Sequence, residues 1–111
     1  MSTNPAPIRS LSIEQKTDDD GNPVLVCSGR MNLETTEQFK TEVKKLSADH
    51  KQIDADMSAI DNIDSAGLGS LLGTYISAKN QGCDLRLINV NPRLKDLLNI
   101  THLTSVLNVQ S

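Results

Sequence analysis

The chain has 111 residues, a formal net charge of −3 and one residue each of Tyr and Phe. This length suits a single domain, residues 1–111, and the mild acidic charge with so few aromatic residues argues against nucleic-acid binding. No apolar run is long enough to span a bilayer, and Met1–Pro7 is polar with two prolines, unlike a signal peptide. We therefore expect a cytoplasmic protein without membrane insertion.

The first third of the chain predicts two strands joined by a turn. Residues 1–7 are expected to form a flexible tail, and the partly alternating apolar positions within 8–13 predict a first strand near a sheet edge. Lys16–Pro23 contains Asp-Gly and Asn-Pro, which favour a turn, and its three aspartates lack the ligand spacing of a calcium loop. Pro23–Ser28 is apolar enough for a central strand, which Gly29–Asn32 is expected to end.

A covering helix and a third strand follow. Residues 35–48 show a partial apolar stripe with a charged opposite side, which predicts a helix. Gln52–Met57 alternates, so that Asp54 and Asp56 share one face of a strand. The two aspartates form either a functional carboxylate pair or an exposed strand face, and we favour the second, with helices covering only the other face. The apolar stripe comprises Leu33, Phe39, Val43 and Leu46.

The centre of the chain predicts a strand, a helix and another strand. Residues 60–63 end at Asp64, a good N-cap because its carboxylate accepts a backbone N–H one turn into the helix. The helix is predicted over Ser65–Lys79, and Gly82 suits the left-handed turn that follows a helix. Asp84–Asn89 predicts the next strand.

The last quarter begins with a second capping signal. Asn91 can cap a helix, and Pro92 forfeits no hydrogen bond at the first helical position, where an N–H has no acceptor within the helix. A short helix is therefore predicted through about Asn99. A docking segment with a helical turn and a short edge strand should follow. The apolar residues that supply this segment are Ile100, Leu103, Val106, Leu107 and Val109. The element order predicts an α/β fold, with a mixed sheet of four to five strands and three to four helices mainly covering one face.

The predicted helix over residues 65–79 has an unusual distribution of residue sizes. On a helical wheel, five large residues share one side, which we expect to face the core: Leu68, Leu71, Leu72, Tyr75 and Ile76. The other side carries only small residues: Ala66, Gly69, Ser70, Gly73 and Ser77. An exposed glycine within a helix costs about 1 kcal/mol relative to alanine. The small residues therefore form a docking surface for a partner, or they pack under a neighbouring loop.

Residues with reactive side chains are few and scattered. Cys27 and Cys83 lack metal-type spacing and lie in apolar runs, so we expect small buried thiols, although the two could pair in principle. His50 and His102 lie in ordinary polar segments and are expected at the surface. Neither a catalytic triad nor a metal cluster emerges, so we expect no enzyme, no cofactor and no metal site.

Three segments carry a resemblance to a known family. Met57–Ile63 followed by Asp64–Gly69 resembles the phosphorylation-site motif of STAS domains, in particular that of bacterial anti-sigma factor antagonists. Cys27–Asn32 and Leu87–Pro92 resemble the family's strand ends and helix entry. The resemblance covers nearly the whole chain and implies that Ser65 is phosphorylated by an anti-sigma factor that is also a serine kinase. The unphosphorylated protein would bind this kinase, the phosphorylated one would release it, and a serine phosphatase would reset the cycle.

The resemblance also implies a partner-binding surface, and the chain departs from the family pattern in two places: at Asn32, and in the strand with Asp54, which is more polar than the family leads us to expect. The implied surface consists of Asn32, Asp64, Ser65, Ala66, Gly67, Gly69, Ser70 and Gly73. The position of Asn32 commonly holds an aspartate in the family, so a carboxylate would be missing there. The alternative is a STAS subunit that is not phosphorylated and docks permanently in a lipid-transport or signalling complex.

Overall fold

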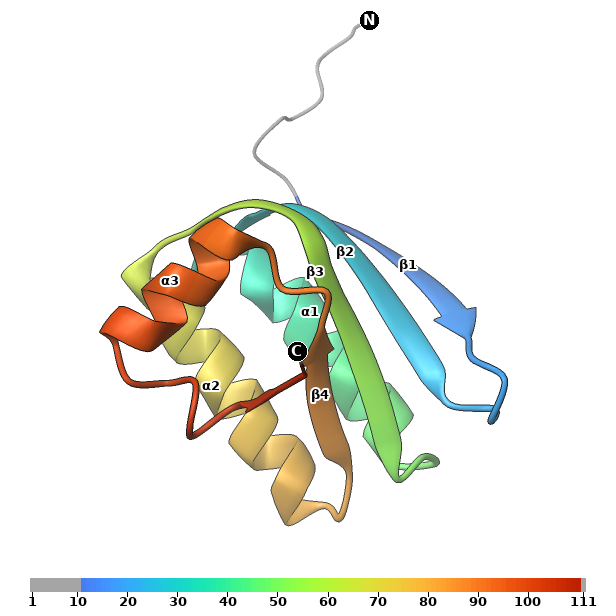
Figure 1. The fold of residues 1–111 in the computed structure, drawn as a ribbon. Coiled ribbons are helices and arrows are strands. Elements are labelled where there is room, and N and C mark those ends of the chain that lie inside the picture. Colours follow the sequence, from blue (N-terminus) through green and yellow to red (C-terminus); the bar gives the residue numbers. More distant parts are fainter. Residues whose placement is uncertain (1–10, 111) are drawn as a thin grey trace, which may run out of the picture.

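The computed structural model describes residues 11–110 and contains five strands and three helices (Figure 1). The elements are β1 Leu11–Thr17, β2 Pro23–Met31, α1 Thr35–Ser47, β3 Gln52–Ile63, α2 Ser65–Asn80, β4 Asp84–Ile88, α3 Pro92–Ile100 and β5 Asn108–Val109. The strands form one sheet in the order β1-β2-β3-β4-β5, in which β1 is antiparallel to β2 and the other pairs are parallel. The predicted α/β fold with a mixed sheet is confirmed.

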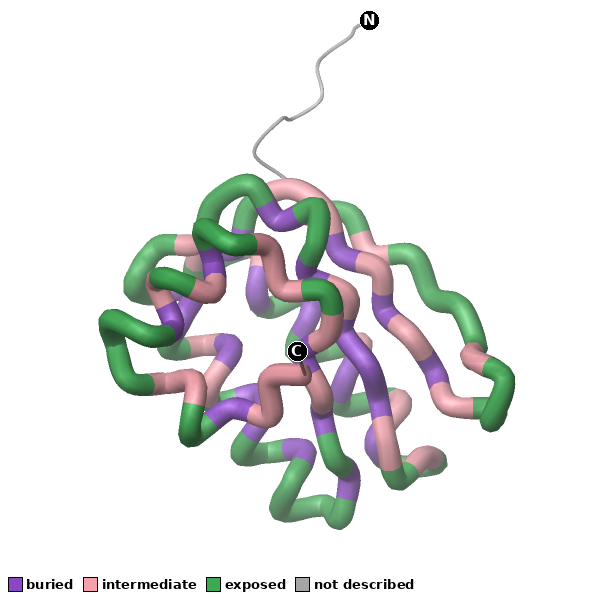
Figure 2. The backbone as a smooth tube through the Cα atoms, viewed as in Figure 1, coloured by how far each residue is buried: buried purple, intermediate pink, exposed green. Residues whose placement is uncertain are grey.

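The helices gather on one face of the sheet, as predicted (Figure 1). From Pro23 to Ser28, alternate residues of β2 are buried and the intervening ones are only half-buried, so β2 covers the core with one face. It is nevertheless central, because it pairs with strands on both sides. Figure 2 shows the buried segments running along the inner strands and along the sides of the helices that face them. The fully buried large side chains include Leu25, Phe39, Val43, Ile53, Met57, Leu71, Leu85 and Leu98.

The opening hairpin is longer than predicted. β1 continues through Thr17, and the turn is held by Asp18, whose carboxylate accepts the N–H groups of Asp20 at 2.9 Å and Asn22 at 2.8 Å. The predicted break at Gly29–Asn32 is wrong, because β2 continues to Met31: it pairs with β1 up to Gly29 and with β3 up to Met31, with register shifts between Val26 and Ser28 and between Gly29 and Arg30. The predicted tail, residues 1–7, and the start of the predicted first strand lie outside the described residues.

The aspartates of β3 have structural partners. Asp54 was expected on an exposed face, but it is only 5% exposed, because the guanidinium of Arg86 on β4 covers it. Arg86 donates from Nε to Asp54 Oδ1 at 2.8 Å and from Nη2 to Oδ2 at 3.2 Å. Burial opposes ionisation of Asp56, but hydrogen bonds from Ser58 and Asn89 outweigh it and lower the pKa of Asp56. Each carboxylate thus has donors of its own, as a structural role requires.

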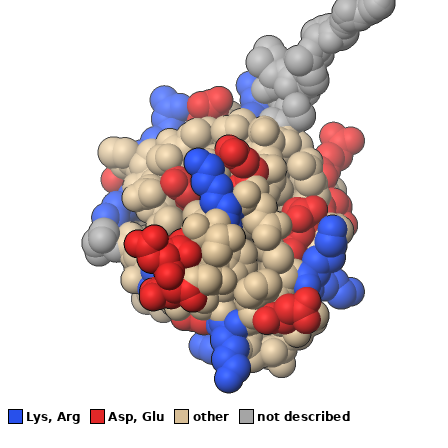
Figure 3. Space-filling view, turned by 90° about the vertical axis from the view of Figure 1, so that its right-hand side faces the viewer, with Lys and Arg blue, Asp and Glu red and all other residues tan. Residues whose placement is uncertain are grey.

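Figure 3 shows the molecule from the side of β1. Acidic and basic side chains are interspersed there and separated by uncharged surface. A nucleic-acid site of the usual kind requires a contiguous basic surface. The face in this view carries none.

Among residues 11–110, four large apolar side chains are exposed, although each was predicted in an apolar stripe, on a core-facing helix side or in the docking segment. They are Leu33, Ile76, Ile100 and Val106. Ile100 ends α3 and Val106 lies in the turn before β5, where the chain changes direction. The docking of the last segment depends instead on buried Leu107, with Leu103 and Val109 half-buried against the core.

Both cysteines are buried and free, as predicted. Burial raises the pKa of the Cys27 thiol to about 12, and the nearby Asp56 carboxylate adds to the shift. Burial also raises the pKa of Cys83. His102 is exposed with φ 60° and follows Thr101, the C-cap of α3, whereas His50 is half-buried with Nδ1 3.0 Å from the Leu46 carbonyl oxygen. Neither thiol has the lowered pKa of a reactive cysteine.

Candidate functional site

The start of α2 lies where the carboxyl ends of two parallel strands meet. Met31, the last residue of β2, pairs with Ile63, the last residue of β3. Asp64 follows directly, and its N–H donates to the Met31 carbonyl oxygen at 3.2 Å. The end of β2 therefore fixes the position of the first turn of α2.

Asp64 is the N-cap of α2, as predicted. It has an extended backbone, φ −94° and ψ 178°, and its Oδ1 accepts the N–H of Gly67 at 2.7 Å. Ser65 is the first helical residue, and both Ser65 and Ala66 are exposed. Their N–H groups have no intrahelical acceptor, because they belong to the first turn. An exposed hydroxyl thus stands at the positive end of a 16-residue helix.

Gly67 differs from the other residues of the predicted partner-binding surface because it is buried. A Cβ at this position would lie 2.2 Å from the Met31 carbonyl oxygen and 3.1 Å from the Asn32 Cα. The glycine lets α2 pass close over the end of β2. The sequence placed Gly67 on the partner-binding surface, but the structure buries this residue, and its role within the fold is close packing.

The exposed face of α2 carries most of the predicted small residues. Ala66, Gly69, Gly73 and Ser77 are exposed and Ser70 is half-buried. A Cβ built on Gly69 or Gly73 meets no atom within 4 Å, so these glycines do not pack under a loop of residues 11–110. The structure leaves this face open.

The wheel prediction is wrong for Ile76, which is 47% exposed, and Leu72 is only half-buried. The buried side of α2 is turned by roughly 60° from the side with the largest residues, on a wheel of about 100° per residue. Its small members, Gly67, Thr74 and Ala78, lie where the helix packs closely. Ile76 consequently joins the face that bears Gly69 and Gly73.

Asn32 lies beside the start of α2 and orders the start of α1. Its Oδ1 accepts the N–H groups of Glu34 at 3.0 Å and Thr35 at 2.9 Å, while its own N–H donates to Thr35 Oγ1 at 2.9 Å. An aspartate could accept the same bonds. Within residues 11–110 the Asn32 Nδ2 donates to no acceptor, so an amide donor stands here in place of the carboxylate that the resemblance had implied.

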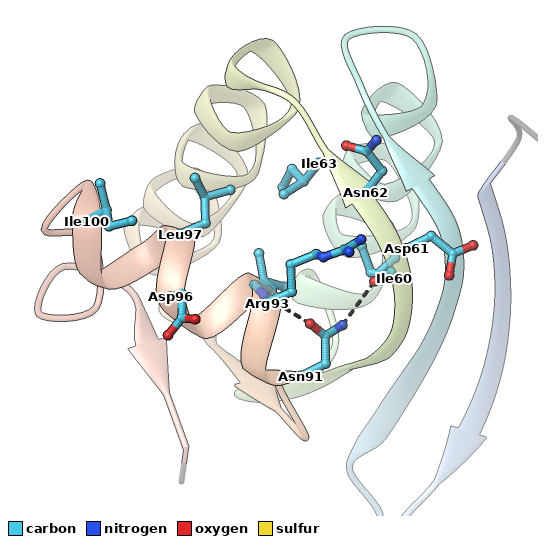
Figure 4. A pocket seen from close by; sticks show the side chains of 10 residues that line it. Ile60, Asp61, Asn62, Ile63, Asn91, Arg93, Asp96, Leu97 and Ile100 are labelled. Atoms are coloured by element: carbon cyan, nitrogen blue, oxygen red, sulfur yellow. Dashed lines mark hydrogen bonds between the residues drawn. The ribbon is translucent and has the colours of Figure 1, made fainter.

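A groove beside Ser65 was not foreseen from the sequence. It has a volume of about 320 Å³ and lies between the end of β3 and α3 (Figure 4). Leu97 and Ile100 form one side of it, and Ile63 lies across the opening. The walls come from segments about thirty residues apart, so local patterns could not reveal it. The lining comprises Ile60, Asp61, Asn62, Ile63, Asn91, Arg93, Leu94, Asp96, Leu97 and Ile100.

Residues 11–110 hold no group of three or more His, Cys, Asp or Glu side chains that could bind a metal ion. They also hold no helix that is long and apolar enough to cross a membrane.

Comparison with known proteins identifies the family. The family model described as the STAS domain matches residues 13–111. The chain belongs to the STAS domain family. Ser65 and the helix behind it are therefore part of a STAS domain, as the motif indicated.

Several relatives are anti-sigma factor antagonists. The anti-sigma-B factor antagonist of Bacillus subtilis (strain 168) is 22% identical over 102 residues, which cover 92% of this chain and 93% of the relative. An anti-sigma factor antagonist from Mycobacterium paratuberculosis has a similar structure, with a TM-score of 0.75, 23% identity and coverage of 94% of this chain and 87% of that one. The Bacillus cell fate determinant SpoIIAA in its phosphorylated form gives a TM-score of 0.66 and 15% identity, covering 90% and 92%. These structures establish the likeness in fold.

Proposed function

We propose that this STAS domain is an anti-sigma factor antagonist that binds an anti-sigma factor serine kinase and is released from it when Ser65 is phosphorylated. The observation that carries the proposal is the position of Ser65. It is exposed, it is the first residue of α2, and the open face of that helix begins with it. The names of the relatives support the class of partner. In this proposal the domain itself is a binding protein and a substrate, not an enzyme, and a serine phosphatase reverses the modification.

The electrostatics of the helix start favour a switch that leaves the fold intact. A phosphate on Ser65 would add about −1.5 to −2 charges at neutral pH. The first-turn N–H groups of α2 and the helix dipole stabilise negative charge there, so we expect α2 to remain folded. The capping bond, in which the Asp64 carboxylate accepts the N–H of Gly67, does not involve the Ser65 side chain. We therefore expect this bond to persist after phosphorylation.

The same charge opposes docking. A partner that covers the start of α2 would have to desolvate a phosphate beside the Asp64 carboxylate, and burying unpaired charge is costly. A free protein pays no such penalty, because water solvates the phosphate. Phosphorylation should therefore reduce the affinity of the complex much more than the stability of the domain.

The test begins with purified anti-sigma factor serine kinases of the source organism, each incubated with this protein and ATP. We expect one phosphate, mapped by fragmentation mass spectrometry to Ser65 and absent from Ser65→Ala. Ser77→Ala is the matched control, because Ser77 is an exposed serine on the same helix. Ser65→Asp should weaken binding to that kinase by about tenfold or more, since a buried unpaired charge costs at least 1–2 kcal/mol.

Two results would contradict the proposal. One is the absence of phosphate on Ser65 with every kinase. The other is equal binding of Ser65→Asp and the unmodified protein. Either result would favour the permanent STAS scaffold in a lipid-transport or signalling complex.

A further inference from the structure

The open face of α2 is too small to form the whole interface with a partner. From Ser65 to Ser77 it is about 20 Å long and about 10 Å wide, on the order of 200 Å². Specific, stable interfaces bury about 800 Å² on each partner. A partner docked over Ser65 must therefore also cover the surface on either side of α2.

Small residues also supply few anchors. Interface affinity is concentrated in a few large side chains or pockets that become fully desolvated. Along α2, only Ile76 among the exposed residues is large and apolar. The principal anchor of a partner should therefore lie next to the helix and not on it.

The groove between β3 and α3 offers an apolar concavity close to Ser65 along the chain. Ile63 lines it and is separated from Ser65 only by Asp64. The rim residue Ile100 is 75% exposed, the largest exposed fraction of any large apolar side chain among residues 11–110. Figure 4 shows Leu97 and Ile100 pointing to the same side of α3, next to the opening.

We propose that the anti-sigma factor kinase inserts one aliphatic or aromatic side chain into the groove between the end of β3 and α3 while it covers Ser65. This inference rests on the proposed function and names the anchor of that same interface. The volume of about 320 Å³ accommodates a large side chain. The groove and the phosphorylation site thereby act in one interface, the groove through apolar burial and Ser65 through charge.

The arrangement separates affinity from switching. Occupation of the groove should not depend on the charge of Ser65, because the groove is lined mainly by apolar atoms of β3 and α3. A variant that blocks the groove should weaken binding of both the unmodified and the phosphorylated protein by a similar factor. A variant without the Ser65 hydroxyl, Ser65→Ala, should keep the contribution of the groove and lose only the change in affinity that phosphorylation causes.

The experiment measures the Kd of the purified kinase that modifies Ser65 for three forms of the full chain. Ile100→Arg places a charge at the rim of the groove, and we expect Kd to rise by about tenfold or more, as for the loss of an interface anchor. Val106→Arg is the matched control, because Val106 is also exposed but does not line the groove. Its Kd should stay within about twofold, as for surface residues outside an anchor. Circular dichroism of both variants checks that they fold.

The outcomes separate the two proposals. If the unmodified protein binds and Ile100→Arg binds equally well, the groove inference is overturned and the switch stands. If no kinase binds the unmodified protein, the switch fails and the groove inference falls with it. If Ile100→Arg lowers the molar mass of this protein alone in light scattering, a second copy occupies the groove and the inference is overturned.

Discussion

Helices α2 and α3 begin in the same way, at the end of a parallel strand with a capping side chain. The Asp64 carboxylate accepts the N–H of Gly67 at 2.7 Å, and the Asn91 amide oxygen accepts the N–H of Leu94 at 2.9 Å. Both cap residues have extended backbones. Judged by the cap alone, the two helix starts are equivalent.

They differ in what the cap leaves unused. Asn91 also donates from Nδ2 to the carbonyl oxygens of Ile60 at 2.9 Å and Met57 at 3.3 Å, and the next residue, Pro92, has no N–H. The amide group of Asn91 is therefore fully used in joining the start of α3 to β3. At α2, the N–H and the hydroxyl of Ser65 have no hydrogen-bond partner within residues 11–110. The two helix starts therefore differ in their unused hydrogen-bond donors and not in the capping bond, and this difference makes the start of α2 the candidate site.

The largest expected effect concerns the packing of the α2 start. Gly67→Ala should destabilise the protein by about 3 kcal/mol, at the upper end of the usual cost of overpacking. The reason is that the new Cβ would lie 2.2 Å from the backbone oxygen of Met31, which cannot move away without disturbing β2. Urea unfolding followed by circular dichroism measures the change.

Gly73→Ala is the control on the same helix. Its Cβ meets nothing within 4 Å, so the higher helix propensity of alanine should stabilise the protein by up to about 1 kcal/mol. Opposite signs at Gly67 and Gly73 would confirm that the two glycines have different roles. Similar losses at both would show that the face bearing Gly73 is covered by part of this chain.

An effect of intermediate size is expected when the two capping side chains are removed in turn and the losses of stability are compared. Asp64→Ala should cost about 1 kcal/mol, the usual cost of losing an N-cap. Asn91→Ala should cost about 2–3 kcal/mol, because it removes the cap and also leaves the carbonyl oxygen of Ile60 without its donor. Urea unfolding of the two variants under identical conditions measures the difference. Equal losses would mean that the Asn91 bonds to β3 contribute little and that the helix starts are alike energetically.

The sequence predicted the features that depend on local chemistry. The cap at Asp64, the Asn91-Pro92 start and the left-handed Gly82 at φ 81° follow from side chains within a turn of one another. The hydrophobic periodicity of the sequence predicted the order of strands and helices, and that order in turn predicted a mixed sheet. Membership of the STAS family followed from the segment around Ser65.

Features that depend on distant packing were not predictable in this way. The wheel assumed that large residues face the core, but α2 buries Gly67 and Thr74 where it packs closely and leaves Ile76 exposed. Likewise Asp54 is buried only because Arg86 on the neighbouring strand covers it. The groove required the placement of α3 beside the end of β3, which no local pattern contains.

The smallest expected effect would make the start of α2 resemble that of α3. Ser65→Pro should change stability by no more than about 0.5 kcal/mol, because proline is tolerated at the first helical position, where the lost N–H has no intrahelical acceptor. The residue before a proline must be extended, and Asp64 already is, at ψ 178°. Thermal unfolding measures the change. A large loss of stability would mean that the Ser65 N–H is already engaged in the folded domain, and the contrast between the two helix starts would fail. If Ser65→Pro folds normally and takes up no phosphate, the start of α2 in this variant has only a structural role, like the start of α3.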